Sequence, residues 1–312
     1  MNNIKIYFVL IGVMFLWGMN VSAIKLLVSD FMPVTITSIR IFVAAMIVFF
    51  ILFPLKKVRK PKNREWLYII LGAFLSIFVH HYFISEGLAK TSAANGGLIL
   101  GLGPMLTAIL SIVLLKRKPS IIRLVGFLLG GVGVSFTVLA GSGGIHNASS
   151  GDFEVFLAIL SQAFSFILIK KASETLDPLL LTGYMLLFGS AMLFVTSLLI
   201  EPNGLASLQH GSPFIWLMFI FSAVLATALG NMVYNYVIGQ IGAAETSIFL
   251  NLSTFFSLIG AALFLKEEIL PSHFIGLLLI VPGVILGSGS LEELLIRRKE
   301  KLTQHPQKKI SL

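Results

Sequence analysis

Long apolar segments follow one another along almost the whole of this 312-residue sequence. A helix needs about 20 mainly apolar residues to span the hydrocarbon core of a bilayer. Ten segments approach that length: Ile6–Val28, Pro33–Leu55, Trp66–Leu88, Ser92–Leu115, Ile121–Ala140, Phe153–Ile169, Pro178–Ile200, Pro213–Ile238, Ala243–Leu265 and Ser272–Ser288. The sequence therefore predicts an all-α membrane protein with ten transmembrane helices.

Charged residues are too scarce to cover a surface that faces water. They make up 12% of the chain, against about 25% of a soluble domain, so membrane lipids are the predicted surroundings. The formal net charge of +9 does not indicate nucleic acid, because most Lys and Arg lie between or after apolar segments. The chain has no cysteine, which excludes disulfides and thiolate metal sites.

The distribution of basic residues predicts the orientation. Cytoplasmic loops carry an excess of Lys and Arg. A cytoplasmic N-terminus places "KKVRKPKNR", "KRKPSIIR", Lys170, Lys171 and the tail "RRKEKLTQHPQKK" on the cytoplasmic side. The first apolar segment is longer than a signal-peptide core and lacks a convincing cleavage site, so we expect it to be retained. The prediction is a multi-pass protein of the inner or plasma membrane with both termini in the cytoplasm.

The two halves of the chain resemble each other. "LAKTSAANGGLILGLGPMLTAILSIVLLKRK" aligns with "IGQIGAAETSIFLNLSTFFSLIGAALFLKEE", and the matches extend to both sides of these segments. The aligned pairs include Ala93 with Ala243, Leu115 with Leu265, Lys116 with Lys266, Gly126 with Gly276, Pro33 with Pro178 and Thr37 with Thr182. Each half holds five predicted spans, an odd number, so the halves enter the membrane in opposite senses. Such inverted repeats are typical of secondary transporters, which bind substrates near the midplane between the repeats.

The repeat predicts the domain organisation. We expect a first five-span repeat over residues 1–140 and a second over 153–290. Between them, 141–152 is a Gly- and Ser-rich outer linker, in which Asn147 begins a short glycosylation pattern. Residues 291–312 form a charged cytoplasmic tail.

Several motifs resemble the EamA family of the drug/metabolite transporter superfamily. They are "FLWGMN" in the first span, "MPVTITSIR" at the start of the second, "TSAANGGLILGLGPMLTAIL" in the fourth and "FLKEEILPSHFIGLLLIVPGV" near the end. The family commonly has an acidic residue after the fourth span, where this chain has Lys118, whereas the second repeat keeps Glu268. The resemblance implies export of amino acids or related small metabolites across the bacterial inner membrane.

Polar side chains inside the predicted spans are candidates for a transport site, although they also bond helices together. In the eighth span, one helical face holds Thr227, Asn231, Tyr234 and Asn235. Such a face lines a cavity or bonds to a neighbouring helix, and we favour the cavity.

The ninth span carries a similar face with Ser247, Asn251 and Thr254. Asn251 lies deep in this span and is a candidate for substrate binding. Glu245 lies near the inner rim, where its side chain either takes part in transport or extends to the interface. Its aligned partner is Asn95, near the outer rim.

Trp17 lies near the middle of the first span, although Trp generally prefers the membrane interface. Asn20 follows one turn later, and Gln162, the repeat counterpart of Trp17, is also central. A central Trp either packs between helices or contacts a ligand, and the neighbouring amides favour the ligand for all three residues.

His80 and His81 lie in the outer half of the third span. Histidine titrates near neutral pH, so His80, which shares a face with Ser76, is a candidate for substrate binding and proton coupling. We expect only one of two adjacent histidines to serve a given site. Arg40 lies inside the second span, where it either pairs with carbonyls or a carboxylate or attracts an anion.

These residues together predict a secondary transporter that works by alternating access. No nucleotide-binding motif, cofactor site or metal cluster is recognisable, so the substrate or protons would supply the driving gradient. One alternative is a membrane-embedded enzyme on a lipid-like substrate, but we find no paired acid and base, and expect no enzymatic activity. A receptor or scaffold without transport is the other alternative.

Overall fold

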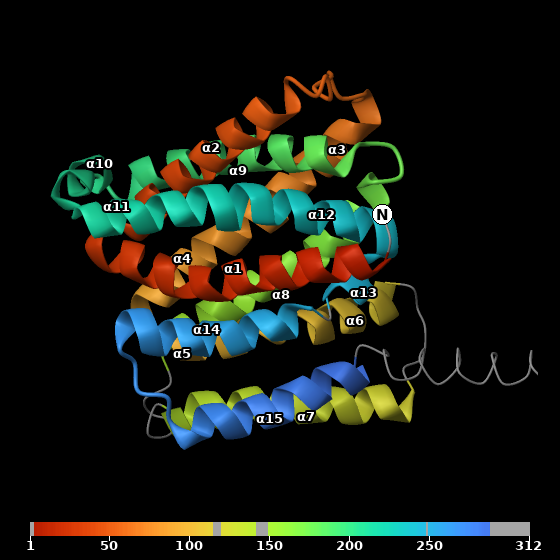
Figure 1. The fold of residues 1–312 in the computed structure, drawn as a ribbon, viewed down its shortest axis with the longest axis vertical. Coiled ribbons are helices and arrows are strands. Elements are labelled where there is room, and N and C mark those ends of the chain that lie inside the picture. The colour runs from red at the N-terminus through yellow and green to blue at the C-terminus, as the bar shows by residue number, and fades with distance from the viewer. Residues whose placement is uncertain (1–2, 115–119, 142–148, 248, 288–312) are drawn as a thin grey trace, which may run out of the picture.

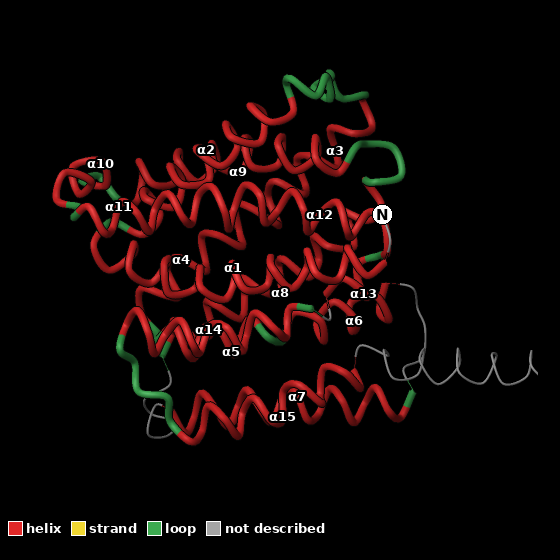
Figure 2. The backbone as a smooth tube through the Cα atoms, viewed as in Figure 1, coloured by secondary structure: helices red, strands yellow, loops and turns green. Residues whose placement is uncertain are grey.

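The computed structural model describes residues 3–114, 120–141, 149–247 and 249–287. Within these ranges the chain forms helices joined by short turns, without a strand (Figures 1 and 2). Seven helices are long and apolar enough to cross a membrane, and shorter apolar helices cover Ile121–Gly133, Leu250–Leu265 and Pro271–Gly287. The structure confirms the predicted all-α membrane fold.

The helices of the first half follow the five predicted spans. They are α1 (Asn3–Asp30), α2 (Pro33–Leu52), α3 (Asn63–Gly72), η1 (Ala73–Val79), α4 (His80–Lys90), α5 (Ala93–Leu100), α6 (Gly103–Leu114) and α7 (Ile121–Gly141). The third span comprises α3, η1 and α4. The fourth comprises α5 and α6, separated at Gly101 and Leu102.

The second half repeats this order. Its helices are α8 (Ser150–Ala172), α9 (Pro178–Ile200), α10 (Gly204–Ser207), η3 (Leu208–His210), α11 (Pro213–Ile220), η4 (Phe221–Leu229), α12 (Gly230–Ile241), α13 (Ala243–Ser247), α14 (Leu250–Leu265) and α15 (Pro271–Gly287). The sixth predicted span, Phe153–Ile169, is longer at both ends in α8. A capping box between Ser149 and Asp152 starts this helix.

Two π-helical segments occupy matching places in the two halves. η1 interrupts the third span and η4 interrupts the eighth. π-helices are rare, and they occur often at functional sites. Each of these segments is followed directly by an α-helix that carries candidate site residues, α4 in one half and α12 in the other.

The packing relates the two halves by an approximate two-fold axis. α2 packs along α9 at one edge of the bundle, and α7 packs along α15 at the opposite edge (Figure 1). In both pairs a helix meets its own counterpart from the other half. Between the edges, α1 packs against α14, and its counterpart α8 packs against α5 and α6. Both halves therefore build the centre of the bundle.

Glycines permit the closest of these contacts. Gly126 and Gly130 on α7 face Gly283 and Gly287 on α15. A Cβ atom added at Gly126 would lie 2.6 Å from the carbonyl oxygen of Gly283, and one added at Gly283 would lie 2.5 Å from the backbone nitrogen of Gly130. Each helix thus presents a GxxxG motif to the other, which lets two membrane helices approach backbone to backbone.

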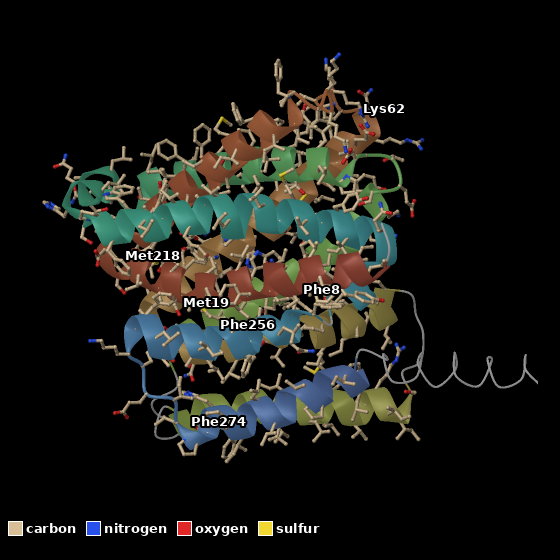
Figure 3. The ribbon with its side chains drawn as sticks, in the orientation of Figure 1. Phe8, Met19, Lys62, Met218, Phe256 and Phe274 are labelled. Atoms are coloured by element: carbon tan, nitrogen blue, oxygen red, sulfur yellow. The ribbon has the colours of Figure 1, made fainter. Side chains whose placement is uncertain are left out.

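The outer surface of the bundle is apolar. Phe50, Phe53 and Leu199 are each more than three quarters exposed, and Phe8 and Phe274, labelled in Figure 3, are more than half exposed. Such a surface matches the hydrocarbon of a bilayer. Most charged groups lie at the two ends of the helices, as Lys62 does in Figure 3.

The two ends of the bundle are named here after a lysine at each. The Lys90 end holds the last turns of α1, α4 and α9, and the Lys57 end holds the connection from α2 to α3. At the Lys90 end, Glu201 accepts hydrogen bonds from the backbone N–H groups of Val34 (2.9 Å) and Thr35 (2.7 Å) at the start of α2. The carboxylate satisfies N–H groups that have no partner within their own helix.

Glu267 does the same for α5, where it accepts from the N–H groups of Ala93 (2.9 Å) and Ala94 (3.0 Å). At the Lys57 end, Arg59 donates to both carboxylate oxygens of Glu65 at 2.7 Å. These bonds raise the pKa of the Arg59 guanidinium. Hydrogen bonds between polar groups thus stabilise both ends of the bundle.

Candidate functional site

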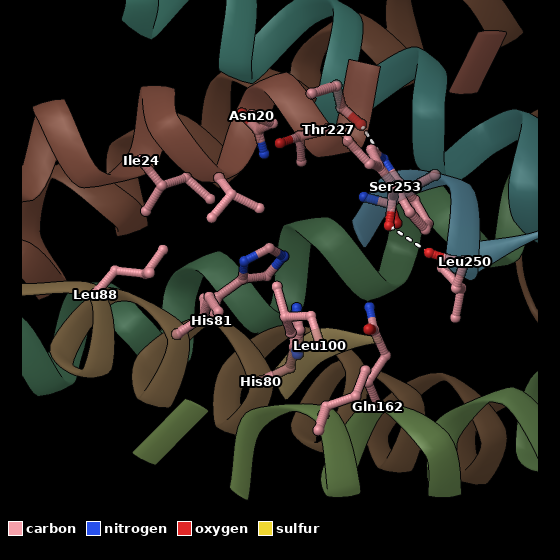
Figure 4. A pocket seen from close by; sticks show the side chains of 16 residues that line it. Asn20, Ile24, His80, His81, Leu88, Leu100, Gln162, Thr227, Leu250 and Ser253 are labelled. Carbon is pink, nitrogen blue, oxygen red and sulfur yellow. Dashed lines mark hydrogen bonds between the residues drawn. The ribbon is translucent and has the colours of Figure 1, made fainter. Parts of the chain in front are cut away.

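A cavity of about 80 Å³ lies at the centre of the bundle, between helices of both halves (Figure 4). This volume is enough for a few water molecules. Its lining is Trp17, Asn20, Val21, Ile24, His80, His81, Ile84, Leu88, Leu100, Ile159, Gln162, Ala226, Thr227, Asn231, Leu250 and Ser253. Five of the residues proposed from the sequence, from four different helices, therefore meet at one place.

Trp17 is held in the cavity wall by a hydrogen bond and by aromatic packing. Its indole N–H donates to the carbonyl of Ala226 at 2.8 Å, and its ring lies 4.7 Å from that of Tyr234. A Cβ atom at Gly230 would lie 2.5 Å from the indole nitrogen. Gly230 therefore leaves the space that Trp17 fills, so Trp17 both packs between helices and lines the cavity.

Both histidines line the cavity, which differs from the expectation that only one would serve it. His80 and His81 leave α4 in different directions, but their rings remain 4.8 Å apart. Nδ1 of His80 lies 2.9 Å from the carbonyl oxygen of Ala158 on α8. Because a carbonyl only accepts, Nδ1 carries the hydrogen, and Nε2 of a neutral His80 is an acceptor.

His81 has the opposite tautomer. Its Nδ1 lies 3.4 Å from Nη2 of Arg40. A guanidinium only donates hydrogen bonds, so Nδ1 of His81 accepts and its hydrogen is on Nε2. The two imidazoles therefore offer the cavity different groups, an acceptor on His80 and a donor on His81.

Three amide side chains add to the polar lining. Asn20 comes from α1, Gln162 from α8 and Asn231 from α12. Oδ1 of Asn20 is buried and has no hydrogen-bond partner among the residues that the structure describes. A buried acceptor without a partner costs roughly 1–3 kcal/mol, so a ligand or water that donates to it would be favoured.

Tyr234 and Asn235 do not line this cavity, although the sequence placed them on one face with Asn231. Tyr234 lies behind Trp17, between its ring and that of Phe166, and its hydroxyl lacks a partner in the described ranges. Nδ2 of Asn235 donates to Thr182 of α9 at 2.9 Å. These two side chains lie further along α12 and contact neighbouring helices, which was the alternative left open for this face.

Asn251 also lies away from the cavity wall, and its Oδ1 is buried without a described partner. The predicted face with Ser247 and Thr254 assumed one continuous helix, but α13 ends at Ser247 and α14 begins at Leu250. Thr254 instead packs against Gly101, directly after α5, and Ser257 packs against Gly97 of α5. That face of α14 is a helix contact.

Two other polar residues reach the cavity instead. Thr227 belongs to the predicted polar face of the eighth span, and Ser253 lies outside every predicted polar face. A serine within an apolar helix gives little signal, because it readily bonds to its own backbone, as Ser253 does to Leu250 at 2.8 Å.

Some sequence predictions concern residues or side chains that the structure does not describe. These are the side chain of Glu245, most of the linker predicted over 141–152 with the pattern at Asn147, and the tail predicted over 291–312. Among the described residues, no group of three or more His, Cys, Asp or Glu side chains could hold a metal ion.

Comparison with known proteins places the chain in a family. The model of the EamA-like transporter family matches residues 4–139 and again 149–289. The chain is 30% identical to the uncharacterized transporter YyaM of Bacillus subtilis, with 93% of this chain and 95% of the relative covered. It is 25% identical to the uncharacterized transporter sll0355 of Synechocystis, with 91% and 90% covered.

A solved crystal structure has the same fold, with a TM-score of 0.63 at 18% sequence identity, over 93% of this chain and 98% of the other. The two family matches together cover nearly the whole chain, and each corresponds to one half of the helix bundle. The chain therefore belongs to the EamA-like transporter family.

Proposed function

We propose that this protein is a secondary transporter that exports amino acids or related small metabolites across the cell membrane. The observation that carries the proposal is the central cavity, to which both halves of the bundle contribute polar side chains. Trp17, Asn20 and His80 come from the first half, and Gln162 and Asn231 from the second. A site between inverted repeats is the arrangement that alternating access requires.

The chemistry of the cavity suits a small polar molecule. The amides of Gln162 and Asn231 line the cavity, where they can offer a substrate both donors and acceptors. Apolar residues such as Ile24, Ile84 and Leu100 fill the rest of the wall. A few convergent polar groups in an apolar setting are typical of metabolite sites.

The inverted repeats supply the two states that transport needs. Each repeat packs against the other through a pair of equivalent helices at either edge, α2 with α9 and α7 with α15. Rocking of the repeats about these two contacts would open the cavity first at one end and then at the other. The cavity would remain in place while its access changes.

The charge distribution supports the orientation. The described basic residues Lys57, Arg59, Lys60, Lys62, Arg64, Lys170 and Lys171 gather near the Lys57 end. By the positive-inside rule this end faces the cytoplasm, and the Lys90 end faces outward. The substrate gradient or protons would drive export, with His80, whose Nε2 is an acceptor, as the candidate for carrying the proton.

The test is a flux measurement on the purified full-length protein in liposomes. Each common amino acid would be loaded in turn, with and without an imposed pH gradient, and its exit compared with that from protein-free liposomes. Flux that a pH gradient changes would indicate proton coupling, whereas equal flux would indicate facilitated export. If no amino acid or related metabolite crosses faster than in protein-free liposomes, the proposed function is wrong.

A further inference from the structure

Arg40 is the most deeply buried cation that the structure describes. It is 1% exposed, two turns into α2, and its partners are also buried. Its Nη1 donates to Ser222 at 3.1 Å and to Thr227 at 2.8 Å, while its Nη2 faces His81. All three partners are neutral groups, so they solvate the charge without balancing it.

No described carboxylate lies within ion-pair distance of Arg40. The four ion pairs among the described side chains involve Lys57, Arg59 and Lys90, all at the ends of the bundle. The acidic residues with described side chains also lie at or near helix ends: Asp30, Glu65, Glu86, Asp152, Glu154, Glu174, Asp177, Glu201, Glu267 and Glu268. A buried charge without a counter-charge is strongly unfavourable, and within a membrane such residues generally mark a substrate or ion path.

Two of the partners of Arg40 also line the central cavity. They are Thr227 on η4 and His81 on α4, and both are among the side chains around the cavity in Figure 4. The guanidinium therefore lies directly behind the cavity wall, and its positive potential acts across these two side chains.

Arg40 also determines which hydrogen-bonding groups they offer. Because Arg40 only donates, the Thr227 oxygen accepts from it, and the Thr227 hydroxyl hydrogen has no acceptor among the described hydrogen bonds. By the same argument His81 carries its hydrogen on Nε2. Arg40 thus leaves both wall residues with a hydrogen to donate to a ligand.

We propose that this arrangement recognises a carboxylate on the substrate. Its oxygens would accept from Thr227 and His81, and its charge would balance that of Arg40 behind them. Arg40 is then a positioning residue, which acts through the two side chains that touch the ligand. This inference rests on the proposed transport function, and it narrows the substrates to anions and zwitterions with a carboxylate.

The test compares carboxylates with the corresponding amides, in which a neutral carboxamide replaces the carboxylate, on the purified full-length protein. The melting temperature would be measured with acetate against acetamide, and with each common amino acid against its amide. We expect at least one carboxylate to stabilise the wild-type protein more than its amide does. Arg40→Gln should remove this preference, with carboxylate affinity falling roughly tenfold or more, because the charge that balances the carboxylate from behind Thr227 and His81 is lost.

Further variants separate recognition from folding. Arg40→Lys should recover part of the preference, because it restores the charge without the planar fork. Thr227→Val should weaken carboxylate binding with Arg40 intact, whereas Thr227→Ser should keep it. Lys171→Gln, which removes an equal charge from an exposed position, is the matched control.

The outcomes are distinct from those of the flux experiment. If no carboxylate stabilises the wild-type protein more than its amide, or if Thr227→Val and a folded Arg40→Gln both keep the preference, the carboxylate proposal is wrong even where flux is observed. If the preference depends on Arg40 but nothing crosses the liposome membrane, the carboxylate site stands and the transport function fails.

Discussion

The indole N–H of Trp17 donates to the carbonyl of Ala226 at 2.8 Å, and so joins the first helix of one half to the π-helical segment of the other. A related contact occurs across the approximate two-fold axis. There the hydroxyl of Ser161 on α8 donates to the carbonyl of Leu75, in the other π-helical segment, at 3.1 Å. In each half, a side chain of the first helix therefore donates a hydrogen bond to a backbone carbonyl in the π-helical segment of the other half.

Trp17→Phe tests this contact, because phenylalanine keeps an aromatic ring but cannot donate. We expect a loss of about 1 kcal/mol in stability, the usual net value of one hydrogen bond, together with reduced flux. Thermal unfolding and liposome flux measure the two effects. Trp216→Phe is the control, since Trp216 packs against Phe31 and Phe219, away from the cavity. Equal effects of the two substitutions would contradict a special role for Trp17.

Gly126→Ala tests the contact between α7 and α15. The added methyl group overlaps the backbone of α15 near Gly283 and Gly287, so the helices must separate. Overpacking of this kind typically costs about 1–3 kcal/mol, which a lower melting temperature would report. Gly131→Ala, on the same helix, meets no atom within 4 Å and should be neutral or slightly stabilising. A tolerated Gly126→Ala would show that the close approach is not needed.

Asn231→Ala and Asn235→Ala should have different effects, although the two residues lie one turn apart. Asn231 lines the cavity, so its loss should raise the substrate concentration needed for half-maximal flux and leave the melting temperature nearly unchanged. Asn235 bonds to Thr182, so its loss should lower stability by about 0.6 kcal/mol, the average for such bonds in membranes, with little change in affinity. If Asn231→Ala lowers the melting temperature and Asn235→Ala weakens substrate affinity, the cavity wall does not include Asn231.

Glu201→Gln tests the interaction that starts α2. The carboxylate accepts from the N–H groups of Val34 and Thr35 and from the Thr35 hydroxyl at 2.7 Å. An amide keeps one acceptor oxygen and turns a donor toward the helix, so we expect a loss of about 1–2 kcal/mol, similar to that of a helix cap. Glu174→Gln, at an exposed position, should leave thermal unfolding unchanged. If both variants unfold at the wild-type temperature, the cap adds nothing to stability.

The spans and much of the cavity follow from the sequence, because hydrophobic length and internal similarity are properties of the chain alone. The depth of Trp17, Asn20 and Gln162 within their spans correctly indicated the centre of the bundle. Asn235 and Asn251 could not be assigned in this way. The direction of these two side chains depends on where each helix begins and on which neighbouring helix packs against each face. Neither of these can be read from the apolar pattern of the sequence.

Arg40 illustrates a related limit. The sequence shows a charge inside a span, but not whether a carboxylate from another helix reaches it. Its partners, Ser222, Thr227 and His81, come from spans far along the chain, and only the folded arrangement brings them together.

The two π-helical segments have a further consequence, because the candidate residues His80, His81 and Asn231 come directly after them. Each residue of an α-helix turns the chain by about 100°. Deleting a single residue from η1 or η4 would rotate every later side chain of that span by this angle, and would carry the histidines or Asn231 away from the cavity. The direction in which these side chains point therefore depends on the number of residues in η1 and η4, as well as on which residues these are.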